Sequence, residues 1–134
     1  MNSKLNFKQI ITAGAIAAVV SVVINIILYF VFHSVGVISD TVFVQPNEPL
    51  TVVPVIISSI LPTFIGACVF FLFEKYTNNG LKIFSILANV LVFLSLSSPF
   101  MAVQGMPVAY GIVLDVMHLV VAFSLLYFIK KAKN

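Results

Sequence analysis

The sequence predicts an all-α integral membrane protein: a four-helix bundle with up-down-up-down topology and both termini in the cytoplasm. Hydrophobic residues make up 61% of the 134 residues and charged residues only 8%, whereas soluble domains carry about 25% charged residues. Four long apolar runs follow one another, separated by shorter polar segments. So few charges cannot cover a water-facing surface, and we therefore expect a single transmembrane domain over residues 1–134.

The first predicted span covers residues 10–32, an uncharged run that follows Lys4 and Lys8. A membrane helix needs about 20 apolar residues, while the apolar part of a signal peptide has roughly 7 to 15, so this run is expected to be a retained transmembrane helix. Small and polar residues recur along it at helical spacing and predict a face that another helix approaches closely. They are Gly14, Ala17, Ala18, Ser21 and Asn25.

Residues 33–51 form the one long loop of the sequence. Its segment 41–44 is rich in β-branched and aromatic side chains, which favours a short strand or hairpin. The second predicted span, residues 52–73, contains Pro62. A proline removes the backbone hydrogen bond to the residue four positions earlier, so we expect a kink near Ser58.

A turn over residues 74–82 leads to the third predicted span, residues 83–100, and a short uncharged loop leads to the fourth, residues 108–129. Cys68 is the one cysteine of the chain and lies among apolar residues of the second span. We expect it to be buried there as a small apolar side chain.

The lysines predict the orientation of the bundle. The two tails carry five of the seven lysines and the loop between the second and third spans carries the other two, while the remaining loops carry none. Four spans place the tails and that loop on one side, which the positive-inside rule makes cytoplasmic. Nucleic-acid binding would need basic residues gathered on one folded face, so we expect contact with the lipid bilayer and no nucleic-acid partner.

The fourth span contains the only acidic residue inside an apolar run, Asp115, with His118 one turn later. At this spacing the two side chains lie on the same face of a helix. An aspartate in mid-span costs about 2.5 to 3.5 kcal/mol on insertion scales, and such residues usually face the bundle interior and have a function. We therefore expect both side chains to point into the bundle and be buried there, with Asn25 or the Ser58 and Ser59 hydroxyls within hydrogen-bonding reach, directly or through one water molecule.

Polar side chains of all four spans fall in the outer half of the membrane, if each helical residue rises about 1.5 Å. They predict a polar pocket near the outer end of the bundle. Two tyrosines near the outer rim would form an aromatic belt or the mouth of that pocket. The predicted pocket residues are Asp115, His118, Asn25, Ser58, Ser59, Ser97 and Ser98, with Tyr29 and Tyr110 at the rim.

Three interpretations of this cluster are open. It could fix the register of the helices, bind a ligand from the outer side, or relay protons through Asp115 and His118. No metal or haem cofactor is expected, because bundle metal sites combine several Glu and Glu-x-x-His motifs and the second histidine, His33, belongs to the outer surface. We expect no enzyme either, since the serines lack the G-x-S-x-G setting of a nucleophile.

A further set of motifs follows the order of the spans. They are Gly14 to Ala18 (G-A-I-A-A), Asn25, Leu61-Pro62, Ser95 to Pro99 (S-L-S-S-P) and Leu114 to Leu119 (L-D-V-M-H-L). Together they resemble a bacterial family of small four-span membrane proteins of unknown function, most specifically in the S-L-x-x-P end of the third span and the Met-His of the fourth. The resemblance implies the four-span fold and a bacterial inner-membrane location, but no activity.

The sequence thus predicts a small multi-pass inner-membrane protein, either a non-enzymatic membrane component or an accessory subunit, with a polar pocket in the outer half of the bundle. A second copy of the chain or another membrane protein is left open as a partner. The alternative function is proton-coupled or small-solute transport, in which Asp115 and His118 titrate.

Overall fold

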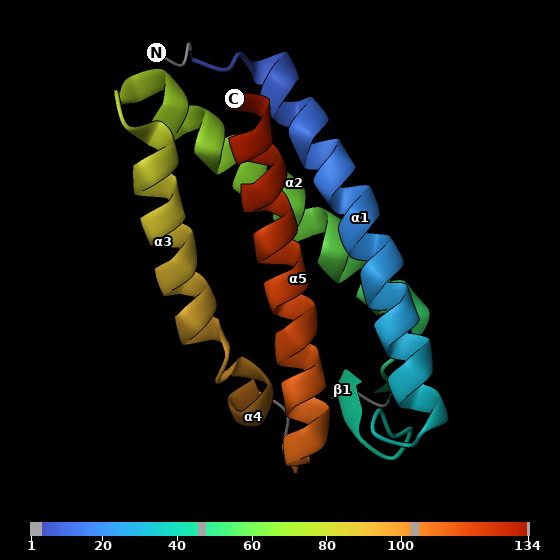
Figure 1. The fold of residues 1–134 in the computed structure, drawn as a ribbon. Coiled ribbons are helices and arrows are strands. Elements are labelled where there is room, and N and C mark those ends of the chain that lie inside the picture. Colours follow the sequence, from blue (N-terminus) through green and yellow to red (C-terminus); the bar gives the residue numbers. More distant parts are fainter. Residues whose placement is uncertain (1–3, 46–47, 103–104, 134) are drawn as a thin grey trace.

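The computed structural model describes residues 4–45, 48–102 and 105–133. Four helical segments in it are long and apolar enough to cross a membrane, and they pack as an all-α bundle (Figure 1). The elements in chain order are α1 (Phe7–Ser34), β1 (Phe43–Gln45), β2 (Glu48–Pro49), α2 (Val52–Tyr76), α3 (Gly80–Ser95), α4 (Ser98–Ala102) and α5 (Val108–Lys133).

The start of α1, the turn from α2 to α3 and the end of α5 lie together at one end of the bundle (Figure 1). We call it the lysine end, because all lysines of the chain belong to these segments. They are Lys4, Lys8, Lys75, Lys82, Lys130, Lys131 and Lys133.

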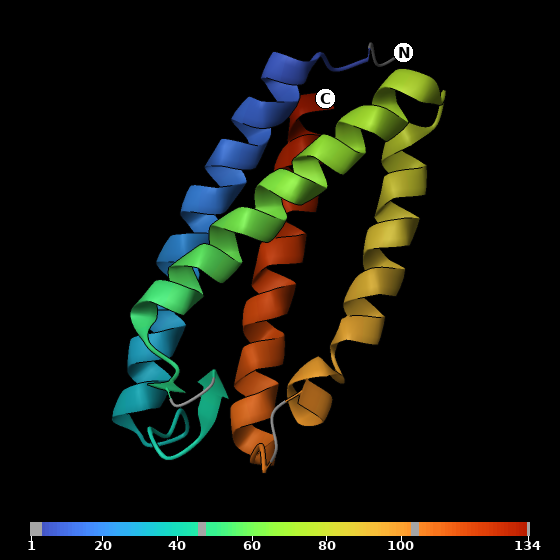
Figure 2. The ribbon, with the colours of Figure 1, turned by 180° about the vertical axis from the view of Figure 1, so that it is seen from behind.

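Helices α1, α2 and α5 form a closely packed trio, and α3 stands to one side of it (Figure 2). Within α3 only Gly80 and Phe84 are buried, and the second of these packs in the core of the trio near the lysine end. Farther along α3, Phe93 is 75% exposed. The short helix α4 returns to the trio, where Phe100 lies against Gly111 of α5.

Local sequence signals define both ends of α1. Asn6 begins the helix with a capping box, in which its side chain accepts from the Gln9 backbone N–H at 2.8 Å and the Gln9 side chain accepts from the Asn6 N–H at 2.9 Å. At the other end Gly36 has φ +84°, and the N–H of Val37 donates to the Phe32 carbonyl at 2.9 Å. This is the Schellman arrangement, whose positive φ favours glycine.

The small-residue face predicted for the first span is confirmed, because all of its members are buried on α1. It lies against α2, where a Cβ atom added to Gly14 would meet the Ala67 Cβ at 3.2 Å. On α2 itself, a Cβ added to Gly66 would come within 2.7 Å of a Leu125 methyl carbon on α5. Small residues therefore set the spacing of the trio.

The core of the trio has three layers along its length. Apolar side chains such as Phe70 and Ile129 fill the layer at the lysine end. Apolar and aromatic side chains such as Met117 and Tyr110 fill the layer at the other end. Between them α1 and α2 contribute a polar layer, whose members are at most 2% exposed: Ser21, Asn25, Ser59 and Thr63.

The third span agrees with the prediction in its extent but consists of two helices. α3 ends at Ser95, and α4 begins only at Ser98. Pro99 explains the break, because proline has no N–H with which to donate to the Ser95 carbonyl. Non-helical backbone at membrane depth is tolerated where it lines a cavity or is buried in protein.

The remaining local predictions have mixed outcomes. The long loop contains a short hairpin as predicted, since β1 and β2 pair antiparallel; its residues 46–47 lie outside the described part. Helix α2 continues through Pro62, and the kink near Ser58 stays a prediction. The expected burial of Cys68 is wrong: the side chain is exposed, because the neighbouring Ala67 makes the close contact with α1.

Glu74 joins the end of α2 to both ends of the chain. Its carboxylate accepts from the Leu5 N–H at 2.9 Å and forms an ion pair with Lys133 at 2.5 Å. The Glu74 side chain is only 3% exposed, so its charge is withdrawn from water and depends on these partners. The local sequence placed Glu74 in a polar turn and did not indicate burial.

We expect Lys133→Met to lower the melting temperature, because Glu74 would keep only the Leu5 N–H as a partner. Leaving a buried charged group short of a hydrogen bond costs about 1 to 3 kcal/mol. Lys131→Met is the matched control: Lys131 is exposed on the last turns of α5, and its loss should change stability by no more than about 0.5 kcal/mol. Thermal unfolding in mild detergent measures both, and equal shifts would contradict the role of the ion pair.

Candidate functional site

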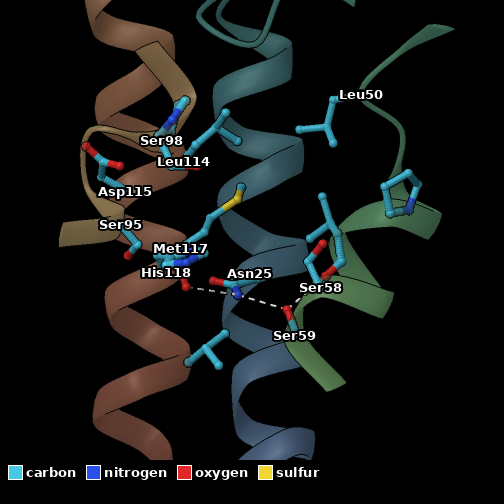
Figure 3. A pocket seen from close by; sticks show the side chains of 14 residues that line it. Asn25, Leu50, Ser58, Ser59, Ser95, Ser98, Leu114, Asp115, Met117 and His118 are labelled. Carbon is cyan, nitrogen blue, oxygen red and sulfur yellow. Dashed lines mark hydrogen bonds between the residues drawn. The ribbon is translucent and has the colours of Figure 1, made fainter. Parts of the chain in front are cut away.

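A pocket of about 350 Å³ lies between the trio and the junction of α3 with α4 (Figure 3). This volume falls within the range of small-molecule sites, roughly 300 to 1,000 Å³. We call it the polar pocket, because polar side chains from every long helix line it. They are Asn25 from α1, Ser58 and Ser59 from α2, Ser95 from α3, Ser98 from α4, and Asp115 and His118 from α5.

α1 contributes Asn25 to the pocket, and this side chain is only 2% exposed. Its Nδ2 group donates to the Ser59 Oγ at 2.9 Å and to the Met117 carbonyl at 3.3 Å (Figure 3). The Met117 carbonyl can only accept, which fixes the orientation of the amide. Asn25 thus links α1 to both other helices of the trio.

The other half of this amide has no partner. The Asn25 Oδ1 atom is buried and forms no hydrogen bond with any residue in the described ranges. An unsatisfied buried acceptor costs about 1 to 3 kcal/mol, and native proteins contain few of them. Asn25 lines the polar pocket, so a ligand in the pocket that reached this oxygen would supply the missing hydrogen-bond donor.

Two of the four serine hydroxyl groups in the pocket lining donate their hydrogens away from the pocket. Ser59 donates to the Val55 carbonyl at 2.8 Å, and Ser95 donates to the Val92 carbonyl at 2.7 Å. Both bonds lie within the serine's own helix and use the hydroxyl hydrogen. The Ser59 oxygen already accepts from the Asn25 Nδ2 group, so it keeps one lone pair for another partner, whereas the Ser95 oxygen keeps two.

Asp115 and His118 line the wall of the pocket that α5 forms (Figure 3). Asp115 is half-buried and His118 is exposed. Among the residues that the structure describes, neither side chain forms a hydrogen bond or an ion pair. The expected direct bonds to Asn25 or to the serines at positions 58 and 59 are therefore absent. Both side chains line the pocket between the helices, but the expected burial is only partial for Asp115 and is wrong for His118, because α3 stands away from this face of α5.

Three predicted residues lie apart from the pocket. Tyr110 is fully buried and Tyr29 is 6% exposed, both in the apolar layer at the end opposite the lysine end, and Tyr29 donates to the Leu50 carbonyl at 3.1 Å. They form neither an aromatic belt nor a pocket mouth, because the loop after α1 folds over them. Ser97 is exposed and donates to the Leu94 carbonyl at 3.1 Å.

That loop also contains a side-chain hydrogen bond that the sequence did not indicate. His33 Nε2 lies 3.0 Å from Asp40 Oδ1, and the His33 ring stacks on Tyr29.

The described residues contain no group of three or more His, Cys, Asp or Glu side chains placed to hold a metal ion.

Comparison with known proteins gives one family. A family of unknown function, DUF6069, matches residues 6–134. The chain belongs to this family. The match confirms the resemblance inferred from the motifs and covers every residue of the polar pocket. No curated protein and no solved structure matches the chain, so an activity has to be argued from the pocket of this DUF6069 protein itself.

We expect Asn25→Leu to leave the melting temperature of the ligand-free protein unchanged or to raise it. Leucine has a similar shape and removes the unpaired oxygen, a gain of about 1 to 3 kcal/mol that offsets the lost bonds to Ser59 and Met117. Ser59→Ala keeps the unpaired oxygen and removes a bonded partner, so it should destabilise by about 1 kcal/mol. Thermal unfolding in detergent compares the two, and a larger loss for Asn25→Leu would assign Asn25 to helix register alone.

Proposed function

We propose that this protein is a non-enzymatic component of the bacterial inner membrane that binds a small ligand carrying hydrogen-bond donors. The observation that carries the proposal is the unpaired, buried Asn25 Oδ1 in a pocket of about 350 Å³. The site belongs to the class of concave pockets in which a few polar groups orient a ligand.

The membrane setting is supported by four helical segments of sufficient length and apolar character. Their ends support an up-down-up-down topology with both termini in the cytoplasm, because the lysines gather at one end of the bundle and positive charge favours the cytoplasmic side. The junction of α3 with α4, which lines the polar pocket, lies toward the opposite end (Figure 1), which supports a place for the pocket in the extracytoplasmic half of the bundle. Lipids of the bilayer are then the first partners of the exposed apolar side chains.

The chemistry of the pocket wall supports a ligand that donates. Asn25 Oδ1 and the Asp115 carboxylate are acceptors, and Ser59 and Ser95 have committed their hydrogens to helix carbonyls. The same bonds support a role without catalysis, because a serine nucleophile needs its hydrogen directed at a base. In the described structure these hydrogens point to backbone carbonyls instead.

Proton or solute transport through one bundle has less support. Between the polar layer and Glu74, the described core of the trio is apolar, with Ala67, Phe70 and Leu125 fully or nearly buried. A proton relay requires a chain of titratable or hydrogen-bonding groups across the membrane. Transport by Asp115 and His118 would therefore need a path outside the core of the trio.

The proposed topology predicts where reporters are active. An enzyme that works only in the cytoplasm should be active when fused after the last residue or inserted in the turn at Asn79. The same reporter inserted after Thr41, in the loop between α1 and α2, should be inactive. Activity after Thr41 would contradict the four-span arrangement with cytoplasmic termini.

Binding itself is tested by native mass spectrometry of the full-length protein extracted from its own membrane in mild detergent. We expect a bound small molecule with the wild type and its loss with Asn25→Leu. Asn89→Leu is the matched control, because Asn89 is exposed on α3 and bonds only within its own helix, to the Ser85 carbonyl at 2.8 Å. Equal occupancy in both variants, or none in the wild type, would refute the proposed function.

A further inference from the structure

A second cavity adjoins the polar pocket and differs from it in chemistry. It is an apolar groove of about 360 Å³ between α2, α3 and α5. Residues from Pro62 to Val69 on α2, from Phe84 to Val92 on α3 and from Val121 to Leu126 on α5 line it. We call it the apolar groove. It exists because α3 stands to one side of the trio (Figure 2).

The groove and the polar pocket lie next to each other. Ser58, His118 and Val121 line both of them. Polar side chains thus lie where the two cavities meet and in the polar pocket. From that meeting point the groove runs toward the lysine end between apolar walls. The floor is closed, because Gly66 and Leu125 bring α2 and α5 into close contact there.

The length of the groove matches a hydrocarbon chain. From Ser58 to Val69 it follows α2 over eleven residues, or about 16 Å at roughly 1.5 Å per residue. Half the hydrocarbon thickness of a bilayer is about 15 Å. The groove is therefore about as long as one acyl chain of a membrane lipid.

We propose that the occupant of the two cavities is a single-chain amphiphile with a hydroxyl-bearing, uncharged head. Its head lies in the polar pocket and donates to Asn25 Oδ1, and its hydrocarbon chain lies in the apolar groove. The inference rests on the proposed function and adds the chemical class of the ligand. The apolar groove accommodates one hydrocarbon chain, so the proposed amphiphile has a single chain.

The charges around the pocket decide against an anionic head. The pocket wall carries the Asp115 carboxylate, the sequence contains no arginine, and every lysine lies at the other end of the bundle. A phosphate or carboxylate head would lie beside the Asp115 carboxyl group, and His118 is the one side chain in the pocket lining that could offset its negative charge. Hydroxyl groups satisfy the acceptors of the wall without this cost.

The test uses tryptophan fluorescence, since the sequence contains no tryptophan. Leu91→Trp places a reporter in the groove, and Phe93→Trp places a control on the face that is 75% exposed. Each full-length protein is reconstituted in phosphatidylcholine vesicles with increasing amounts of a monoacylglycerol whose chain carries two bromine atoms, which quench nearby tryptophan. The methyl ester of the same brominated chain lacks donors, and the ionised fatty acid carries a negative charge.

We expect the monoacylglycerol to quench the Leu91→Trp reporter with saturation at low mole fraction, and the Phe93→Trp control only in proportion to its amount. Adding Asn25→Leu should raise the half-saturating amount roughly tenfold, the effect of losing one hydrogen bond of about 1.4 kcal/mol. The methyl ester and the fatty acid should give the proportional response in both proteins. Equal saturation by ester and monoacylglycerol, or no effect of Asn25→Leu, would overturn the inference.

The result is separable from that of the proposed function. If native mass spectrometry finds a molecule whose binding depends on Asn25 but no brominated chain saturates the reporter, the pocket binds a ligand without a chain in the groove, and the amphiphile is refuted alone. If neither measurement depends on Asn25, both proposals fail together.

Discussion

The close contact between α1 and α2 is the constraint on which the rest of this bundle depends. Lipid chains are as apolar as leucine, so membrane helices associate through close packing and hydrogen bonds rather than through hydrophobic burial. Gly14 opposite Ala67 allows that packing, and Gly66 extends it to α5. α3 has large side chains along its length, such as Phe93 and Leu94, which face outward. It therefore joins the trio mainly at the lysine end and leaves the space that becomes the two cavities.

The polar layer holds two buried atoms without a hydrogen-bond partner among the described residues, Ser21 Oγ and Asn25 Oδ1, and the close contact explains how the second arises. Ser59 and Thr63 bond to carbonyls of their own helix, so their positions are set locally, and Asn25 reaches Ser59 only because α1 and α2 are so near. One amide then joins three helices while its oxygen is left unpaired. A protein optimised for stability alone would replace this atom, and sites that break such a rule tend to be functional.

Local properties of the sequence predicted the spans, the lysine end and the small-residue face of α1, because hydropathy, charge and residue size do not depend on which helices meet. The surroundings of Asp115 and His118 could not be predicted in the same way. The helices are apolar on nearly all sides, so periodicity does not identify the face that meets a neighbour. The ion pair of Glu74 joins residues 59 positions apart, and the burial of Tyr110 depends on a loop folding over it. Neither feature can be recognised from the neighbouring residues in the sequence.

A single residue of the sequence, Pro99, affects both cavities. By ending α3 at Ser95 it shortens the helix to 16 residues, about 24 Å, against a hydrocarbon thickness of about 30 Å. The chain then turns through α4, where Phe100 packs on Gly111, and Ser95 and Ser98 come to line the polar pocket. A straight third helix would continue past this point and occupy the side of α5 that now faces the pocket. The break thus brings two serines into the wall of the polar pocket, while α3, which stands to one side of the trio (Figure 2), forms one wall of the apolar groove.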